Sequence, residues 1–176
     1  MKNHTRNSKF LSLVLRHRPE RIGLSLDENG WAKVEDLLEK LPFPLDFASL
    51  KNIVDTSDKQ RFAFNEDFSL IRANQGHSVN VDLQLAVLQP PPLLYHGTPG
   101  KNIPSIEKQG LHKARRHHVH LSADVQTAEK VGNRRGRAVI LTVKAEEMYQ
   151  AGHIFYRSEN GVWLTESVPV EYLVFP

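Results

Sequence analysis

The chain has 176 residues, 40% of them hydrophobic and 24% charged, which fits a globular protein of one domain or two small lobes and excludes a disordered chain. The absence of cysteine excludes a disulfide framework and a thiolate metal site, and it agrees with a reducing cytoplasm. The net charge is +3, and the apolar run at residues 10–15 is too short for a signal peptide or a membrane span.

The first third of the chain shows the pattern of three short helices. Apolar residues at helical spacing predict a helix over residues 8–17, with Ser8 as its N-cap. Residues 27–30, Asp-Glu-Asn-Gly, predict a turn. A second helix is expected to end before Pro42, and Asp46 is placed to cap a third.

A hairpin is expected to follow these helices. Residues 61–64 alternate as a strand does, residues 65–67 predict a turn, and a second strand resumes at 70–71. In this register Lys59 and Arg61 point to one face of the first strand. Three short helices and a hairpin resemble a winged helix-turn-helix, a fold that often contacts nucleic acid.

The second half of the chain has the pattern of an α+β fold with mostly antiparallel strands. Residues 79–93 lack a helical period and end in Pro90-Pro91-Pro92, which predicts a stiff linker and a lobe boundary. Beyond it we expect helices over 102–110 and 124–131, and a hairpin turn at Asn160-Gly161. Strands are expected at 93–95, 119–121, 138–143, 154–156, 162–164 and 172–175.

Positive charge is concentrated in two segments. Residues 1–21 carry six Lys or Arg against one acidic residue, and residues 112–137 carry seven against two. Residues 22–71, between them, carry five against ten. This asymmetry points to a localised anion site with nucleic acid as one partner, although a solvated surface also produces basic segments.

Two basic pairs are candidates for binding phosphate, because Arg is well shaped to hold a phosphate by two parallel hydrogen bonds. Arg16 and His17 end a predicted helix, where the helix dipole alone also favours cations. Lys59 and Arg61 would equally suit an exposed hairpin edge. For both pairs a structural role and a functional role stay open.

Histidines mark two further candidates. Tyr95-His96-Gly97-Thr98 is a polar tetrad at the end of an apolar strand, and it fits either a cradle for a nucleotide or a tight structural turn. Arg116 precedes a segment that contains His117, His118 and His120. Because no Asp, Glu or Cys stands at metal-ligand spacing there, we expect no metal site.

Six motifs in this order resemble the RNA 2'-phosphotransferase family (KptA type, tRNA 2'-phosphotransferase). They are Leu15-Arg16-His17, Lys59-Gln60-Arg61-Phe62, Gln75-Gly76-His77-Ser78, His96-Gly97-Thr98, Arg116 with His118-Val119-His120-Leu121-Ser122, and Phe155 through Asn160-Gly161-Val162 to Pro169-Val170-Glu171. Each motif alone is a weak match, but six in register over nearly the whole chain are specific.

The resemblance implies an α+β protein with a winged-helix-like RNA-binding lobe over residues 1–78, a linker over 79–93 and an NAD-binding, ADP-ribosyltransferase-like, mostly antiparallel β lobe over 94–176. It implies an NAD-dependent transferase that removes an internal 2'-phosphate from RNA, as in tRNA splicing or RNA repair. The reaction passes through an ADP-ribosylated RNA 2'-phosphate and gives 2'-hydroxyl RNA, nicotinamide and ADP-ribose 1'',2''-cyclic phosphate. NAD is then a co-substrate, and we expect no metal, no membrane and a cytoplasmic monomer.

The resemblance also assigns residues. The catalytic residues are Arg16, His17, Arg61 and Arg116. The RNA phosphate is assigned to Lys59, Gln75, His77 and Ser78. The NAD side is assigned to His96, Gly97, Thr98, His120 and Ser122. Arg116, and not Arg115, has the family's spacing to His118-Val119-His120.

The chemistry agrees with these roles. A phosphate monoester has a second pKa near ~6, so the RNA 2'-phosphate is largely a dianion and already a nucleophile at neutral pH. The enzyme has to position two anionic reactants, and guanidiniums also stabilise the charge that grows on the phosphoryl oxygens. The departing RNA 2'-oxygen needs a proton, for which His17 is the candidate donor.

Two other functions stay open. One is an enzyme that ADP-ribosylates a protein or a nucleic-acid end, and it would depend on Glu166 or Glu171. The resemblance places an apolar residue at the catalytic glutamate position of those enzymes, so Glu171 is expected at the surface and Glu166 stays unassigned. The other is an RNA-binding module without catalysis, in which Arg16, Arg61 and Arg116 lie on separate faces.

Overall fold

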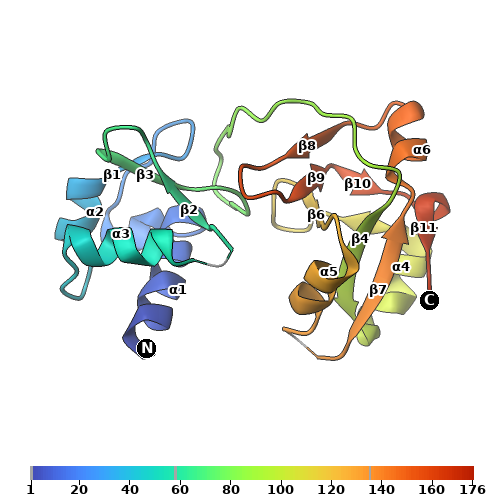
Figure 1. Cartoon of the computed structure of the whole chain (residues 1–176), viewed down its shortest axis with the longest axis horizontal. Coiled ribbons are helices and arrows are strands. Elements are labelled where there is room, and N and C mark those ends of the chain that lie inside the picture. The colour runs from blue at the N-terminus through green and yellow to red at the C-terminus, as the bar shows by residue number, and fades with distance from the viewer. Residues whose placement is uncertain (1, 58, 135) are drawn as a thin grey trace. The chain divides into compact units, whose positions relative to one another are not determined.

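The computed structural model describes residues 2–57, 59–134 and 136–176. The chain divides into two compact units, Met1–Gln84 and Leu85–Pro176 (Figure 1). Each unit has its own cluster of buried hydrophobic residues, and the two clusters share no member. Among the described residues, no helix is both long and apolar enough to cross a membrane.

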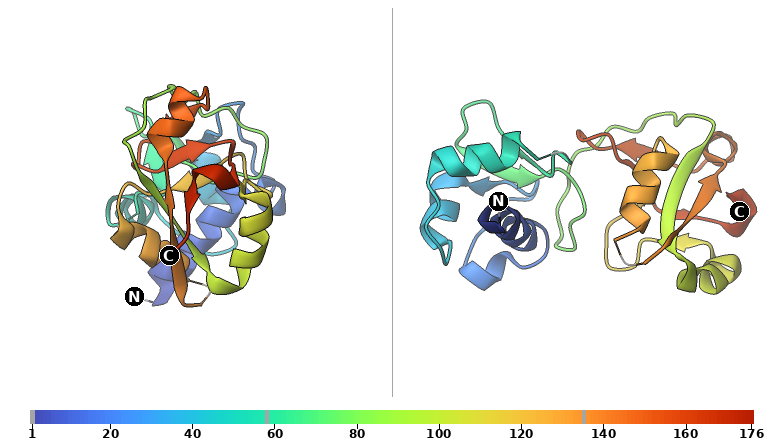
Figure 2. Two further views of the ribbon diagram at one scale, coloured as in Figure 1. Left: turned by 90° about the vertical axis from the view of Figure 1, so that its right-hand side faces the viewer. Right: turned by 60° about the horizontal axis from the view of Figure 1, so that its bottom comes forward.

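The first unit combines helices with a three-stranded antiparallel sheet in the order β1-β3-β2. Its core is built by the apolar face of α1 and by residues from α2, α3 and the sheet. Both Figure 1 and Figure 2 show the hairpin of β2 and β3 next to α3. The elements are α1 (Lys2–Arg16), the 3-10 helix η1 (Pro19–Ile22), β1 (Ala32–Lys33), α2 (Val34–Lys40), α3 (Phe47–Asp55), β2 (Phe62–Phe64) and β3 (Leu70–Ala73).

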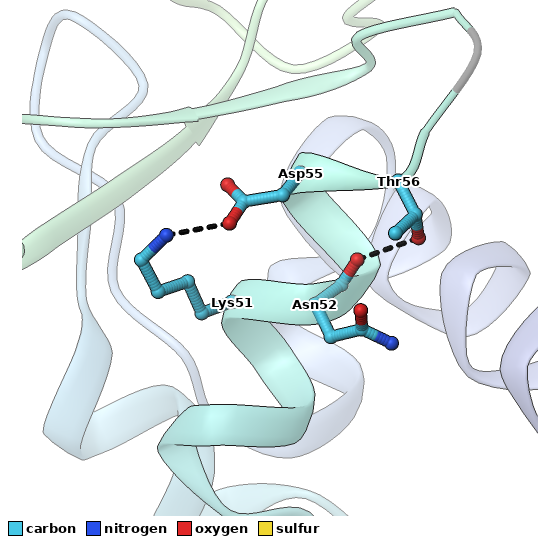
Figure 3. A network of polar contacts seen from close by, with 4 residues as sticks. All are labelled: Lys51, Asn52, Asp55 and Thr56. Carbon is cyan, nitrogen blue, oxygen red and sulfur yellow. Dashed lines mark hydrogen bonds and ion pairs between the residues drawn. The ribbon is translucent and has the colours of Figure 1, made fainter.

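The ends of α3 are fixed by side chains. Asp46 accepts a hydrogen bond from the Ser49 amide at 2.8 Å, which confirms the predicted N-cap. Near the other end, Lys51 pairs with Asp55 one turn along the helix, and the Thr56 hydroxyl donates to the Asn52 carbonyl at 2.6 Å (Figure 3). The helix therefore ends at a defined place just before the loop that leads to Arg61.

Two predictions for the first unit are wrong. The first helix begins at Lys2, so Ser8 lies inside it and is not its N-cap. Its first turns are tied to the rest of the unit, since His4 Nε2 lies 3.2 Å from the Thr56 hydroxyl. Lys59 and Arg61 do not share a strand face, because the strand begins only at Phe62 and Gln60 has a left-handed φ of 38°.

The second unit carries three antiparallel sheets, of which β11-β7-β4 and β6-β9-β8 have three strands each and β10-β5 has two. The strands predicted at 119–121 and 138–143 are confirmed as β6 (Val119–Leu121) and β7 (Ala138–Val143). The other elements are β4 (Leu94–Pro99), η2 (Gly100–Asn102), α4 (Ile103–Gln109), β5 (Leu111–His112), α5 (Val125–Gly132), α6 (Ala145–Gln150), β8 (Phe155–Arg157), β9 (Trp163–Thr165), β10 (Ser167–Val168), η3 (Val170–Tyr172) and β11 (Leu173–Val174).

Candidate active site

The first unit brings Arg16, His17 and Arg61 to one place. The guanidinium of Arg16 donates from Nη2 to the carbonyl of Arg61 at 3.5 Å, across 45 residues of sequence. The Arg16 carbonyl in turn accepts from the amide of Ser78 at 2.9 Å, and the Ser78 hydroxyl lies 2.9 Å from Nδ1 of His17. The end of α1 is thus joined to two distant segments, each of which carries a predicted site residue.

Asn74 holds the backbone on which Arg61 stands. Its amide donates to the Arg61 carbonyl at 2.9 Å, and its side-chain Nδ2 donates to the Gln60 carbonyl at 2.6 Å. The Arg61 guanidinium contacts the Ser57 hydroxyl from Nη1 at 3.5 Å. Because Gln60 has a left-handed backbone, these bonds stabilise a conformation that a glutamine alone disfavours.

The predicted phosphate-binding residues of this unit differ in exposure. Ser78 is exposed, while Lys59 and Gln75 are half-buried. His77 is only 2% exposed, and its Nε2 would lie 3.3 Å from a Cβ added at Gly30. The His77 ring therefore packs inside the unit beside Gly30.

The predicted NAD-side residues lie where β4 and β6 meet. Tyr95 and Ser122 exchange backbone hydrogen bonds at 2.9 and 2.8 Å, which joins the end of β6 to β4. Next to this bridge, Nδ1 of His96 lies 3.0 Å from the His120 carbonyl. Because a carbonyl only accepts, His96 must carry its hydrogen on Nδ1, and Nε2 is the acceptor nitrogen.

Arg116 joins the same group. Its Nη1 lies 2.8 Å from Nδ1 of His120, so Nδ1 of His120 acts as the acceptor. Burial lowers the pKa of His96, and the nearby positive charge of Arg116 lowers it further, while the hydrogen bond to the His120 carbonyl acts in the opposite direction. His96 is therefore a neutral imidazole at neutral pH, next to a guanidinium.

Gly97 and Thr98 lie inside β4 and not in a turn, since both pair with β7. A Cβ at Gly97 would lie 1.9 Å from the Ala128 carbonyl oxygen, so the missing side chain lets α5 pack directly against the strand. The close approach expected at this glycine is thus made by a helix of the same unit. Thr98 is 4% exposed, and its hydroxyl accepts from Nδ2 of Asn102 at 3.0 Å.

The two glutamates on which the ADP-ribosylation alternative depends are both exposed. Glu166 pairs with Lys113, and this hydrogen bond is the main cause that lowers the pKa of its carboxyl. His118 stacks edge-on against Tyr156 at 5.3 Å between ring centroids, and burial lowers the pKa of His118. Within the described segments, no group of three His, Cys, Asp or Glu could hold a metal ion.

Asn74 and Asn102 contribute to these groups, and the sequence analysis assigned a role to neither of them. Asn74 acts through a bond to a carbonyl 14 residues away, which no local pattern signals. For Asn102 the sequence does hold a local signal. It lies four residues after Thr98, at the beginning of a predicted helix, and a polar side chain at that place often binds the backbone or a neighbouring hydroxyl.

Comparison with known proteins identifies the family of the chain. The profile described as "RNA 2'-phosphotransferase, Tpt1 / KptA family" matches residues 2–167. A probable RNA 2'-phosphotransferase of Flavobacterium johnsoniae is 57% identical over 96% of this chain and 94% of its own length. Proteins of the same name from Trichormus variabilis and Burkholderia pseudomallei are 56% and 53% identical, over 94% and 98% of this chain and 93% and 95% of their own. The chain therefore belongs to the RNA 2'-phosphotransferase (Tpt1/KptA) family.

Proposed function

We propose that the chain is an NAD-dependent RNA 2'-phosphotransferase that removes an internal 2'-phosphate from RNA in two steps. Family membership over residues 2–167 supports the phosphotransferase activity. The observation that supports the assignment of residues is the contact of the Arg16 guanidinium with the Arg61 carbonyl, across 45 residues of sequence, next to the contact of His17 with Ser78. We assign RNA binding to this unit as a winged-helix-like lobe, and NAD binding to the second as an ADP-ribosyltransferase-like lobe.

Arg16 and Arg61 would hold the 2'-phosphate. At neutral pH this group is largely a dianion, and guanidiniums offer it paired, charge-assisted hydrogen bonds. The two residues share a bond between the Arg16 guanidinium and the Arg61 carbonyl, so each orients the other. Lys59, Gln75 and Ser78 stand on the adjoining segments and would contact flanking parts of the RNA. The role of buried His77 would be to hold the segment that ends in Ser78.

The groups in the second unit fit NAD. Arg116, assigned to catalysis, offers positive charge to a phosphate, and the imidazoles of His96 and His120 and the hydroxyl of Ser122 suit ribose and amide groups. Glu166 is already paired with Lys113. Thr98 and Gly97 would act by fixing β4. NAD, consumed as co-substrate, supplies a ribose carbon that accepts the phosphate oxygen and a nicotinamide leaving group.

His17 would protonate the RNA 2'-oxygen when it leaves phosphorus. Ser78 fixes Nδ1 of the ring at 2.9 Å, so Nε2 is the atom from which the proton would be delivered. The His17→Ala variant should then stall after the first step and accumulate RNA that carries ADP-ribose. A variant that slows both steps equally would contradict the assignment of His17 as the acid.

The function is tested by incubation of the protein with an RNA that carries a single internal 2'-phosphate. We expect 2'-hydroxyl RNA only when NAD is present, and no reaction on a matched RNA whose phosphate is at the 5' end. Conversion without NAD, or no conversion with it, would overturn the proposal.

A further inference from the structure

A second positively charged site lies in the first unit, in a pocket of about 650 Å³. Its lining comes from α1, from η1 and from the loop between α2 and α3. Arg6, Lys9 and Arg21 supply three positive charges, Phe10 and Phe43 supply two aromatic rings, and no Asp or Glu lines the pocket. In the described part of the chain, none of the three cations forms an ion pair with an acidic side chain.

The aromatic rings and the cations are arranged together. Phe10 and Phe43 meet edge to face with their centroids 5.4 Å apart, and the guanidinium of Arg21 lies over the Phe10 ring at 5.9 Å. Aromatic faces that bases stack on, combined with cations that meet the backbone, are the usual means of binding single-stranded nucleic acid. The volume of the pocket is within the range that accommodates a small ligand such as one nucleotide.

The pocket lies on the same face of α1 as the candidate catalytic group. Arg6, Lys9, Leu13 and Arg16 follow one another at spacings of three or four residues, which places them on one side of the helix. At 1.5 Å per residue, Lys9 and Arg16 are about 10 Å apart along the axis, a length of roughly three stacked nucleotides at ~3.4 Å each. A strand that presents its 2'-phosphate to Arg16 would therefore reach the pocket.

We propose that this pocket binds a nucleotide of the substrate RNA about three positions from the 2'-phosphate, with a base against Phe10 and Phe43 and phosphates on Arg6 and Lys9. This inference rests on the proposed function for the identity of the RNA. It adds a subsite that makes a longer RNA a better substrate than a short one, without a role in the chemical step.

The test compares two RNAs with the same internal 2'-phosphate, one of three nucleotides and one of about ten. The Arg6→Gln/Lys9→Gln variant removes two charges from exposed positions and keeps good helix propensity. The ratio of kcat/KM for the long RNA to that for the short RNA should fall about tenfold in this variant. The dependence of log affinity on log salt should become shallower by about 0.7 for each RNA phosphate that the variant no longer neutralises.

The matched control is Lys33→Gln/Lys51→Gln, which removes two positive charges from β1 and α3 of the same unit. It should keep the wild-type ratio. If both double variants change the ratio equally, or neither does, the pocket is not an RNA subsite and an acidic protein partner becomes the better occupant.

Failure of this inference can be told apart from failure of the proposed function. If the wild-type protein acts on neither RNA, the function is wrong, and fluorescence anisotropy with a ten-nucleotide RNA without a 2'-phosphate still decides about the pocket. There the Arg6→Gln/Lys9→Gln variant should bind about tenfold more weakly than the wild type and the control. Equal binding by all three proteins would overturn the inference.

Discussion

Arg61 is held mainly through its backbone, and this leaves its side chain for a ligand. The Arg61 carbonyl accepts from the Arg16 guanidinium and from the Asn74 amide, while the Arg61 guanidinium has, among the described residues, one long contact, to Ser57 at 3.5 Å. Arg116 is instead held through its guanidinium, which contacts His120. The two arginines therefore differ in what orients them, although the same reaction is assigned to both.

Replacement of either arginine by alanine should slow the reaction strongly. Arg61→Ala and Arg116→Ala should each lower kcat/KM about a hundredfold, or roughly 3 kcal/mol of transition-state stabilisation. Arg115→Ala is the matched control, because Arg115 is an exposed arginine adjacent to Arg116, and it should stay within about twofold of wild type. Wild-type turnover in Arg61→Ala, or equal losses in the Arg115 and Arg116 variants, would contradict the assignment.

Asn74 is a positioning residue for Arg61. It is 7% exposed, and its Oδ1 has no hydrogen-bond partner within the described segments, so the side chain contributes mainly the bond from Nδ2 to Gln60. Asn74→Ala should lower the free energy of unfolding by only about 1 kcal/mol. It should lower kcat about tenfold, because the backbone that positions Arg61 loses the hydrogen bond from Asn74. Urea unfolding and single-turnover rates on the same samples measure the two effects.

Asn65→Ala is the control for this variant. Asn65 makes comparable side-chain bonds in the turn between β2 and β3, to the Leu70 amide and the Ser69 hydroxyl. It should lose similar stability with turnover unchanged. If activity follows stability in the same way in both variants, Asn74 has no positioning role.

His96 should make the stability of the second unit depend on pH. Its pKa is lowered in the folded state, so the unfolded chain binds more protons below about pH 6.5, and the free energy of unfolding must fall as the pH falls. One such group contributes at most about 1.4 kcal/mol per pH unit. His118, whose pKa burial also lowers, acts in the same direction.

The measurement is urea unfolding between pH 7 and 5, followed by the fluorescence of Trp163 in a Trp31→Phe background so that only the second unit reports. His96→Asn can still donate a hydrogen bond to the His120 carbonyl but does not titrate, so it should reduce the pH dependence. If the free energy of unfolding depends on pH equally in the protein with His96 and in the His96→Asn variant, His96 is not buried as a neutral imidazole.

At the scale of elements, Gly97 is a contact point between α5 and β4. An added Cβ would lie 1.9 Å from the Ala128 carbonyl oxygen and 3.1 Å from the Gly132 amide nitrogen, so Gly97→Ala must push the helix off the strand. We expect a loss of about 3 kcal/mol in the free energy of unfolding. In Gly100→Ala the new Cβ meets only Val139 at 3.7 Å, and thermal melting should be near that of wild type. Equal stability of the two variants would contradict the packing at Gly97.

Elements that are specified by neighbouring residues were predictable, and those that depend on distant partners were not. Asp46 caps α3 as predicted, because its carboxylate binds an amide three residues away, and Asp124, predicted as the first residue of a helix, caps α5 in the same way. The two-residue strands β1, β5 and β10 were missed, since each is defined only by pairing with a distant segment. The left-handed backbone of Gln60 was missed for the same reason, because the Gln60 carbonyl is bound by Asn74, which follows β3 and lies 14 residues further along the chain.

Across the whole molecule, the motifs showed which residues belong to the candidate site. They were less informative about what each of these residues does. Arg16, His17, Arg61 and Arg116 were assigned to one catalytic group, and in the first unit the Arg16 guanidinium contacts the Arg61 carbonyl while His17 contacts Ser78. Gly97 was assigned to the NAD side, and the space that a side chain would take there is filled by α5. A motif identifies a residue type that the fold or the function needs at a position. Only the structure shows whether that residue contacts another part of the protein or is available to a ligand.

In the proposed reaction, RNA gives up its 2'-phosphate to the ADP-ribose part of NAD, so the fate of the phosphorus atom distinguishes this reaction from the alternatives. An RNA labelled with ³²P in its internal 2'-phosphate is incubated with the protein and NAD, and the products are separated by chromatography. We predict that all released label appears in ADP-ribose 1'',2''-cyclic phosphate, in equal amount to the 2'-hydroxyl RNA. Label recovered as inorganic phosphate, or retained on RNA as a stable ADP-ribosylated end product, would contradict the account.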